Sequence, residues 1–184
     1  MKTTLVIILL VASAFAQYQS PLDAAEAACG PKDVKFEVKS GAPQPAAPNK
    51  SQPGKAIVYV IEDLGQCSDC TGRSNAFSTN VANALTKVGL DGAWVGANQG
   101  NSYFFFTVEP GEHHLCINWQ SRLQVRSRAF AMSNFTADAG TVYYFRERLF
   151  PGNADYSFDL DPINTDEGKY LVATSSYSIA HSKK

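Results

Sequence analysis

Two cysteines separated by two residues form the most suggestive chemical motif of this chain. Cys67 and Cys70 enclose Ser68 and Asp69, a spacing shared by thiol–disulfide redox centres and by metal sites. A redox pair needs a thiolate stabilised at a helix N-terminus, typically within a βαβ pattern. The flanking residues here are rich in Gly, Ser and Thr, so the pattern favours a structural disulfide and leaves redox or metal chemistry as alternatives.

The chain contains four cysteines, and the other two are Cys29 and Cys116. Four cysteines allow three pairings, which the sequence does not distinguish. We expect Cys29–Cys116 together with the local bridge of the Cys-x-x-Cys motif, because the long link would tie an N-terminal extension to the body of the protein. Closing so long a loop stabilises a protein by roughly 4 kcal/mol, whereas the tight local ring removes little chain entropy.

No standard catalytic or metal-binding motif accompanies the cysteines in the sequence. His113 and His114 are adjacent in an expected strand, so their side chains point to opposite faces. Zinc bound by the close cysteine pair with Cys116 and His114 matches no standard finger spacing. The chain also lacks a Gly-x-Ser-x-Gly elbow, a His-Glu-x-x-His motif and a phosphate-binding glycine loop. We therefore expect no catalytic residue, no metal and no cofactor.

The acidic residues near the C-terminus lack the spacing of an EF-hand, and we expect a solvated acidic edge. These residues are Asp155, Asp159, Asp161, Asp166 and Glu167.

Three side chains are candidates for ligand contact. Trp94 adjoins an Asp-Gly hairpin signal and is the best candidate for an exposed aromatic ring. Arg122 and Arg126 belong to a short basic cluster that would suit a polyanion or a lipid headgroup, although a solvated strand face is the simpler interpretation.

Aromatic residues also occur in two runs, at 103–106 and 143–145, which place rings on both faces of two strands. We expect these rings to pack between sheets, or between a sheet and a C-terminal helix. An aromatic platform for a sugar or a peptide is the alternative.

The first sixteen residues have the order of a cleaved secretory signal. Lys2 precedes an apolar stretch at 5–11, which leads to Ala14-Phe15-Ala16. The apolar stretch is too short to span a bilayer, which takes about 20 residues. We expect cleavage between Ala16 and Gln17, followed by export to the periplasm or the extracellular space.

Length and charge narrow the possible partners. The chain has 184 residues, with 16 Lys and Arg against 17 Asp and Glu, a formal net charge of −1. This length suits one domain with a short extension. Because a nucleic-acid-binding domain carries a basic face, the balance of charge argues against such a partner.

The elements that position these residues are expected to be mostly short strands. Residues 56–61 are apolar and β-branched, which is typical of a buried central strand. Asp91-Gly92 indicates a two-residue hairpin, because a type I′ turn needs positive φ at both residues. Other strands are expected at 34–39, at 102–108 and 113–119 (antiparallel about a turn at 109–112), at 123–132 and 141–149 (a further pair), and at 156–160 as the last strand.

The fold class that follows is all-β, an antiparallel β-sandwich or open barrel with one short C-terminal helix and an N-terminal extension. The helix is expected at 164–172, with Thr165 as its N-cap. The expected divisions are a signal peptide at 1–16, an extension of one short helix and one strand at 17–39, a proline-rich linker at 40–54, a β domain at 55–175 and a tail at 176–184.

Several segments together carry a family resemblance, namely 54–60, 88–96, 100–104, 108–113, 139–145 and 166–169. In their order they resemble the bacterial family of unknown function numbered 2846, over most of residues 54–175. The unit around Gly92 and Gly111 is also similar to PEGA-type surface modules of bacterial envelopes. The resemblance implies export and a β fold, and it carries over no catalytic residue.

We therefore expect an exported, non-catalytic binding or envelope-associated module. Its ligand would be a glycan, a peptidoglycan fragment or a protein, with no membrane span. The alternative is a thiol–disulfide redox protein or a metal-binding protein that uses Cys67 and Cys70.

Overall fold

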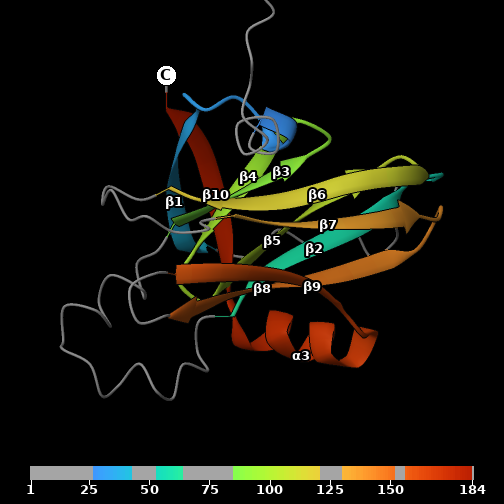
Figure 1. Ribbon diagram of the computed structural model, residues 1–184. Coiled ribbons are helices and arrows are strands. Elements are labelled where there is room, and N and C mark those ends of the chain that lie inside the picture. Colours follow the sequence, from blue (N-terminus) through green and yellow to red (C-terminus); the bar gives the residue numbers. More distant parts are fainter. Residues whose placement is uncertain (1–26, 43–52, 64–84, 121–129, 152–155, 184) are drawn as a thin grey trace, which may run out of the picture.

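The computed structural model describes residues 27–42, 53–63, 85–120, 130–151 and 156–183 (Figure 1). The strands within these residues are β1 Lys35–Ala42, β2 Ala56–Glu62, β3 Leu85–Leu90, β4 Ala93–Gln99, β5 Ser102–Val108, β6 Gly111–Trp119, β7 Phe130–Ala137, β8 Val142–Pro151, β9 Tyr156–Ile163 and β10 Ser176–Lys183. Helix α3 spans Thr165–Thr174, and residues 27–29 are also helical. No helix among the described residues is long and apolar enough to cross a membrane.

The strands form two sheets that pack face to face. The larger sheet has the order β1-β10-β5-β2-β8-β9, and the smaller sheet has the order β4-β3-β6-β7. This arrangement, with α3 on the outer face of the larger sheet, confirms the expected β-sandwich with one C-terminal helix (Figure 1). The smaller sheet is antiparallel throughout, whereas β10–β5 and β2–β8 are parallel pairs, so the larger sheet is mixed.

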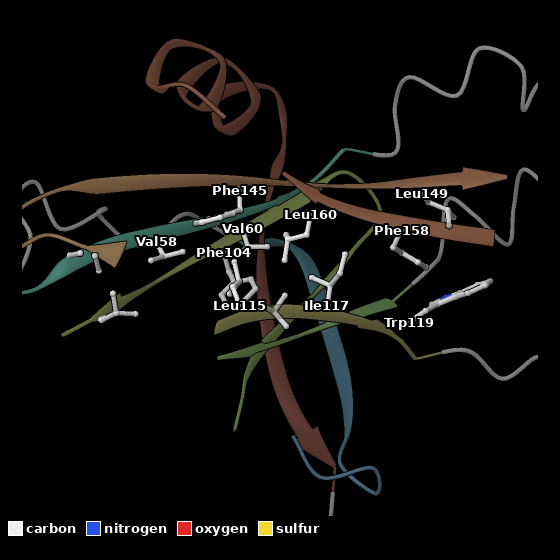
Figure 2. Packing of buried hydrophobic residues seen from close by; sticks show 14 residues of the cluster. Val58, Val60, Phe104, Leu115, Ile117, Trp119, Phe145, Leu149, Phe158 and Leu160 are labelled. Atoms are coloured by element: carbon white, nitrogen blue, oxygen red, sulfur yellow. The ribbon is translucent and has the colours of Figure 1, made fainter. Parts of the chain in front are cut away.

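The core lies between the two sheets. Val58 and Val60 of β2 and Phe145 of β8 face Leu115 and Ile117 of β6 across this space (Figure 2). Every residue of β2 is buried, because its second face lies beneath α3. The apolar run at 56–61 is therefore a central strand, as expected.

The Asp91-Gly92 hairpin is confirmed, but two other expected hairpins are wrong. Strands β3 and β4 pair, and the φ angles of Asp91 and Gly92 are 50° and 83°. By contrast, β5 pairs with β2 and β10 while β6 pairs with β3 and β7, so the turn after β5 crosses between the sheets. The turn after β7 crosses in the same way to β8. Turn signals mark where a chain reverses, but side-chain packing decides which sheet receives the next strand.

The expected extension and tail each supply a strand of the larger sheet. Strand β9 is not the last strand, because β10 follows α3 and lies between β1 and β5. Most of β10 is polar and exposed, and among its described side chains only Ser178 is buried. Its place depends on main-chain pairing with β1 and β5 rather than on an apolar face, so an alternating pattern does not reveal it.

Helix α3 begins one residue earlier than its predicted cap implies. Its N-cap is Asn164 rather than Thr165, and Asn164 Oδ1 accepts hydrogen bonds from the main-chain N–H groups of Asp166 and Glu167 at 3.0 and 2.9 Å. Two acids in the first turn also interact favourably with the helix dipole.

Candidate functional site

The long disulfide expected from the sequence is present. Cys29 and Cys116 are bonded, with their Cα atoms 5.7 Å apart. Because Cys116 is bonded to Cys29, it does not serve as a zinc ligand. Cys67 and Cys70 lie outside the described residues, so their redox chemistry stays a prediction.

Trp94 packs against the N-terminal segment beside this disulfide. Its Nε1 donates to the Pro31 carbonyl at 2.8 Å, and Lys87 Nζ lies 4.1 Å from the centroid of its ring. A Cβ atom at Gly30 would lie 2.7 Å from Trp94 Nε1, so glycine is needed for this contact. Trp94 is half-buried and lines neither of the two pockets described below. Arg122 and Arg126 lie outside the described residues.

Most of the C-terminal acids within the described part of the chain pair with two arginines of β8. Arg148 Nη2 lies 2.6 Å from Asp161 and 4.0 Å from Asp159, and Arg146 pairs with Glu167. No group of three or more His, Cys, Asp or Glu side chains in this part of the chain is arranged to hold a metal ion.

One pocket, of about 460 Å³, is lined mostly by residues of β6 and β7, together with Asp91 from the turn between β3 and β4. Among its lining residues, His113 Nδ1 lies 2.7 Å from Asp91 Oδ2, and His113 Nε2 lies 2.7 Å from the Glu109 carbonyl. Partial burial opposes the charge of His113, but the hydrogen bonds to Asp91 and Glu109 raise its pKa. Both ring nitrogens are occupied, so neither is available as a general base or a metal ligand.

The larger pocket, of about 580 Å³, lies between α3 and the outer face of the larger sheet. We call it the tyrosine pocket. Its lining residues are Gly41, Tyr59, Tyr103, Tyr144, Lys169, Val172, Ala173, Ser175, Ser176 and Tyr177. Four tyrosines from β2, β5, β8 and β10 therefore meet at one place.

The period of two along each strand explains this convergence. Tyr103 and Tyr144 alternate with Phe104 and Phe145, whose rings enter the core between the sheets. The interpretation of the aromatic runs as packing on both faces is therefore confirmed. Tyr59 stacks on Tyr144, with ring centroids 5.0 Å apart and planes inclined by 18°.

Each of the four tyrosines brings one hydroxyl group to the lining of this pocket, beside the polar side chains of Lys169, Ser175 and Ser176. Burial raises the pKa of all four, and neighbouring tyrosines raise the pKa of Tyr59 and Tyr103 further. Each hydroxyl therefore stays protonated at neutral pH and is both a donor and an acceptor.

Two buried glutamates form a third polar site that the sequence analysis missed. Glu62 and Glu147 are each 1% exposed and are register partners on β2 and β8. Glu62 accepts from Thr86 Oγ1 at 3.3 Å, and Glu147 accepts from Asn98 Nδ2 at 2.8 Å. Burial raises the pKa of Glu62 well above its usual range and raises that of Glu147 to about 8.

Strand periodicity could have found this pair. Glu62 is in phase with Val58 and Val60, and Glu147 is in phase with Phe145. A charged residue in the phase of the core is the signal.

Comparison with protein-family models, with curated proteins and with solved structures finds no significant match to this chain. The resemblance to the bacterial family of unknown function numbered 2846 therefore stays a prediction.

Proposed function

We propose that this protein is an exported, non-catalytic binding module whose tyrosine pocket takes a sugar unit of a glycan. The observation that carries the proposal is the convergence of four tyrosines from four strands on one open pocket. Sugar hydroxyls donate and accept hydrogen bonds, and each tyrosine hydroxyl does the same. The volume of the pocket also lies within the range of small-molecule sites.

The remaining lining residues support binding rather than catalysis. Ser175 and Ser176 add two more hydroxyls, and Lys169 adds a positive charge that would favour an acidic sugar. Among the described residues, no carboxylate or histidine lines this pocket, so it offers no general base of the usual kind. The N-terminal signal pattern and the Cys29–Cys116 disulfide both support an oxidising, exported environment.

Removing single hydroxyls tests the proposal. Isothermal titration of the protein with chitotetraose, cellotetraose and a muramyl disaccharide identifies a bound glycan. The variants Tyr59→Phe and Tyr177→Phe keep the rings and remove one hydroxyl each, so each should weaken binding by about 3- to 10-fold.

Tyr143→Phe is the matched control, because the Tyr143 hydroxyl accepts from the Asp138 main-chain N–H at 3.0 Å, outside the pocket. Its affinity should equal that of the unmodified protein. The proposal fails if none of the three glycans binds, or if both pocket variants bind as tightly as the control.

A further inference from the structure

In the core, the carboxyl group of Glu147 faces the side-chain amide of Asn98, and one oxygen atom of each group has no hydrogen-bond partner. Asn98 Nδ2 donates to Glu147 Oε1 at 2.8 Å and to the Val60 carbonyl at 3.1 Å. On the same two side chains, Glu147 Oε2 and Asn98 Oδ1 are buried and have no hydrogen-bond partner. An ionised carboxyl group and an amide oxygen are both acceptors, so neither can satisfy the other.

A proton on Glu147 Oε2 resolves this conflict. A protonated carboxyl group places an O–H donor beside a carbonyl acceptor, and an amide places a donor and an acceptor in the same arrangement. Glu147 would then donate to Asn98 Oδ1 while Asn98 donates to Glu147 Oε1, closing a cyclic acid–amide pair. The second of these hydrogen bonds is present in the structure.

The arginines of β8 do not offset a negative charge on Glu147. Arg146 and Arg148 alternate with Glu147 along the strand, so they point to the opposite face. There they pair with Glu167 and Asp161 respectively.

The other strands around the pair also bring no positive charge to Glu147 within the described residues. Glu62 of β2 faces Glu147 and is itself a carboxyl group. On β3, Thr86 donates to Glu62, while Lys87 is the next residue and its Nζ donates to the Val34 carbonyl. A second negative charge in this place would be costly, because buried charges without a partner are strongly destabilising.

We propose that Glu147 and Asn98 form a buried proton-binding site, and that the proton held there stabilises the closed β-sandwich. The site is independent of the tyrosine pocket, which lies on the outer face of the larger sheet. It makes the stability of the fold respond to pH.

The sign of the response follows from the two pKa values. A glutamate in an unfolded chain has a pKa of about 4.3, and in the folded chain burial raises the pKa of Glu147 to about 8. Between these values Glu147 is protonated in the folded chain and ionised in the unfolded chain, so it accounts for one additional proton in the folded chain. Glu62, whose pKa burial also raises, adds to this difference in both the unmodified protein and its variants. The contribution of Glu147 should therefore raise the unfolding equilibrium constant about tenfold for each pH unit over this interval, and this contribution should level off above it.

The substitution Glu147→Gln tests the proposal in the full chain. The glutamine side chain mimics the protonated acid, since its amide nitrogen can donate to Asn98 Oδ1. We would measure the urea unfolding of Glu147→Gln and of the unmodified protein from about pH 5 to about pH 8. The unfolding equilibrium constant of Glu147→Gln should rise less steeply with pH, by about a factor of ten per pH unit. His113 titrates in both proteins, so its contribution cancels in the difference.

Glu167→Gln is the matched control, because Glu167 is a surface carboxylate paired with Arg146, and it should keep the unmodified pH dependence. Infrared spectra at neutral pH give a second measurement, in which the unmodified protein should show a protonated carboxylic acid band that is weaker in Glu147→Gln. Equal pH dependence in the protein and Glu147→Gln, or absence of that band, would overturn the proposal. Stabilisation by CaCl₂ or MnCl₂ that EDTA reverses and Glu147→Gln abolishes would also overturn it, because a metal ion would then occupy the site.

Discussion

His113 of β6 shows how one side chain connects two turns, the one between β3 and β4 and the one between β5 and β6. Its ring joins the Asp91 carboxylate to the Glu109 carbonyl, and Asp91 Oδ1 also accepts from the His114 main-chain N–H at 2.8 Å. A histidine with an acceptor at both nitrogens is best satisfied as the cation, which donates from both. Partial burial favours the neutral form of Asp91, but these hydrogen bonds and the histidine charges lower its pKa.

The pH dependence of this pair has a defined sign. Because the pKa of His113 is raised, its stabilising contribution is complete below about pH 6.5 and is lost as pH rises through the raised value. Asp91→Asn should lower the pKa of His113, as measured by NMR titration of the imidazole ring. Relative to the unmodified protein, His113→Gln should have the largest loss of unfolding free energy near pH 5. The loss should become smaller at higher pH, because the unmodified protein then also lacks the ion pair. An unchanged His113 titration in Asp91→Asn would contradict this account.

Helix α3 shows how an element with a weak apolar face is held in place. Leu171 and Val172 pack against the outer aromatic cluster of the larger sheet, and the helix approaches the ring of Tyr144 at Gly168. A Cβ atom at Gly168 would lie 2.2 Å from Tyr144 Cγ. Glycine therefore sets the distance between the helix and the sheet, and with it the shape of the tyrosine pocket.

The variant Gly168→Ala should destabilise the protein, although alanine is the better helix former by about 1 kcal/mol. The added methyl group meets Tyr144, and overpacking of this kind costs about 1–3 kcal/mol. Thermal unfolding should show a lower Tm, and glycan binding should weaken with it. Tyr170→Ala is the control on the same helix, because Tyr170 is 67% exposed, and its Tm should change little. A Tm for Gly168→Ala at or above that of the unmodified protein would show that the helix has room to move.

At the scale of the molecule, the N-terminal segment is tied to the smaller sheet at several points. The Cys29–Cys116 disulfide spans 87 residues of sequence. The Gln120 side chain pairs with the main chain of Phe36, accepting from its N–H at 2.7 Å and donating to its carbonyl at 2.8 Å. Because Phe36 belongs to β1 of the larger sheet, this contact links the two sheets.

Replacing both Cys29 and Cys116 with serine should lower the free energy of unfolding by about 4 kcal/mol, because the unfolded chain regains the entropy of a long loop. Urea denaturation under non-reducing conditions measures the change. The matched double variant at Cys67 and Cys70 should lose much less, since a ring of that size restricts the chain little. Equal losses in the two double variants would contradict the assignment of the long disulfide as the main covalent restraint.

Features that depend on neighbouring residues were predictable from the sequence. The buried run at 56–61 predicts β2, the positive φ preference of Asp91-Gly92 predicts the β3–β4 hairpin, and the alternation of apolar and charged residues predicts β1. Local backbone preferences and burial patterns are sufficient for these elements. The sandwich follows from them, because many short strands with one apolar face must cover one another.

Features that depend on distant residues required the tertiary structure. It places β5 and β6 in different sheets, inserts the polar β10 between β1 and β5, and brings four tyrosines from four strands into one pocket. It also places Asn98 against Glu147, which is 49 residues away in sequence. Sequence determined the strands that have an apolar face, and which face that is, but not β10, which lacks one. The partner of each strand was decided by long-range packing, because main-chain hydrogen bonds are alike for every strand and side-chain fit distinguishes one partner from another.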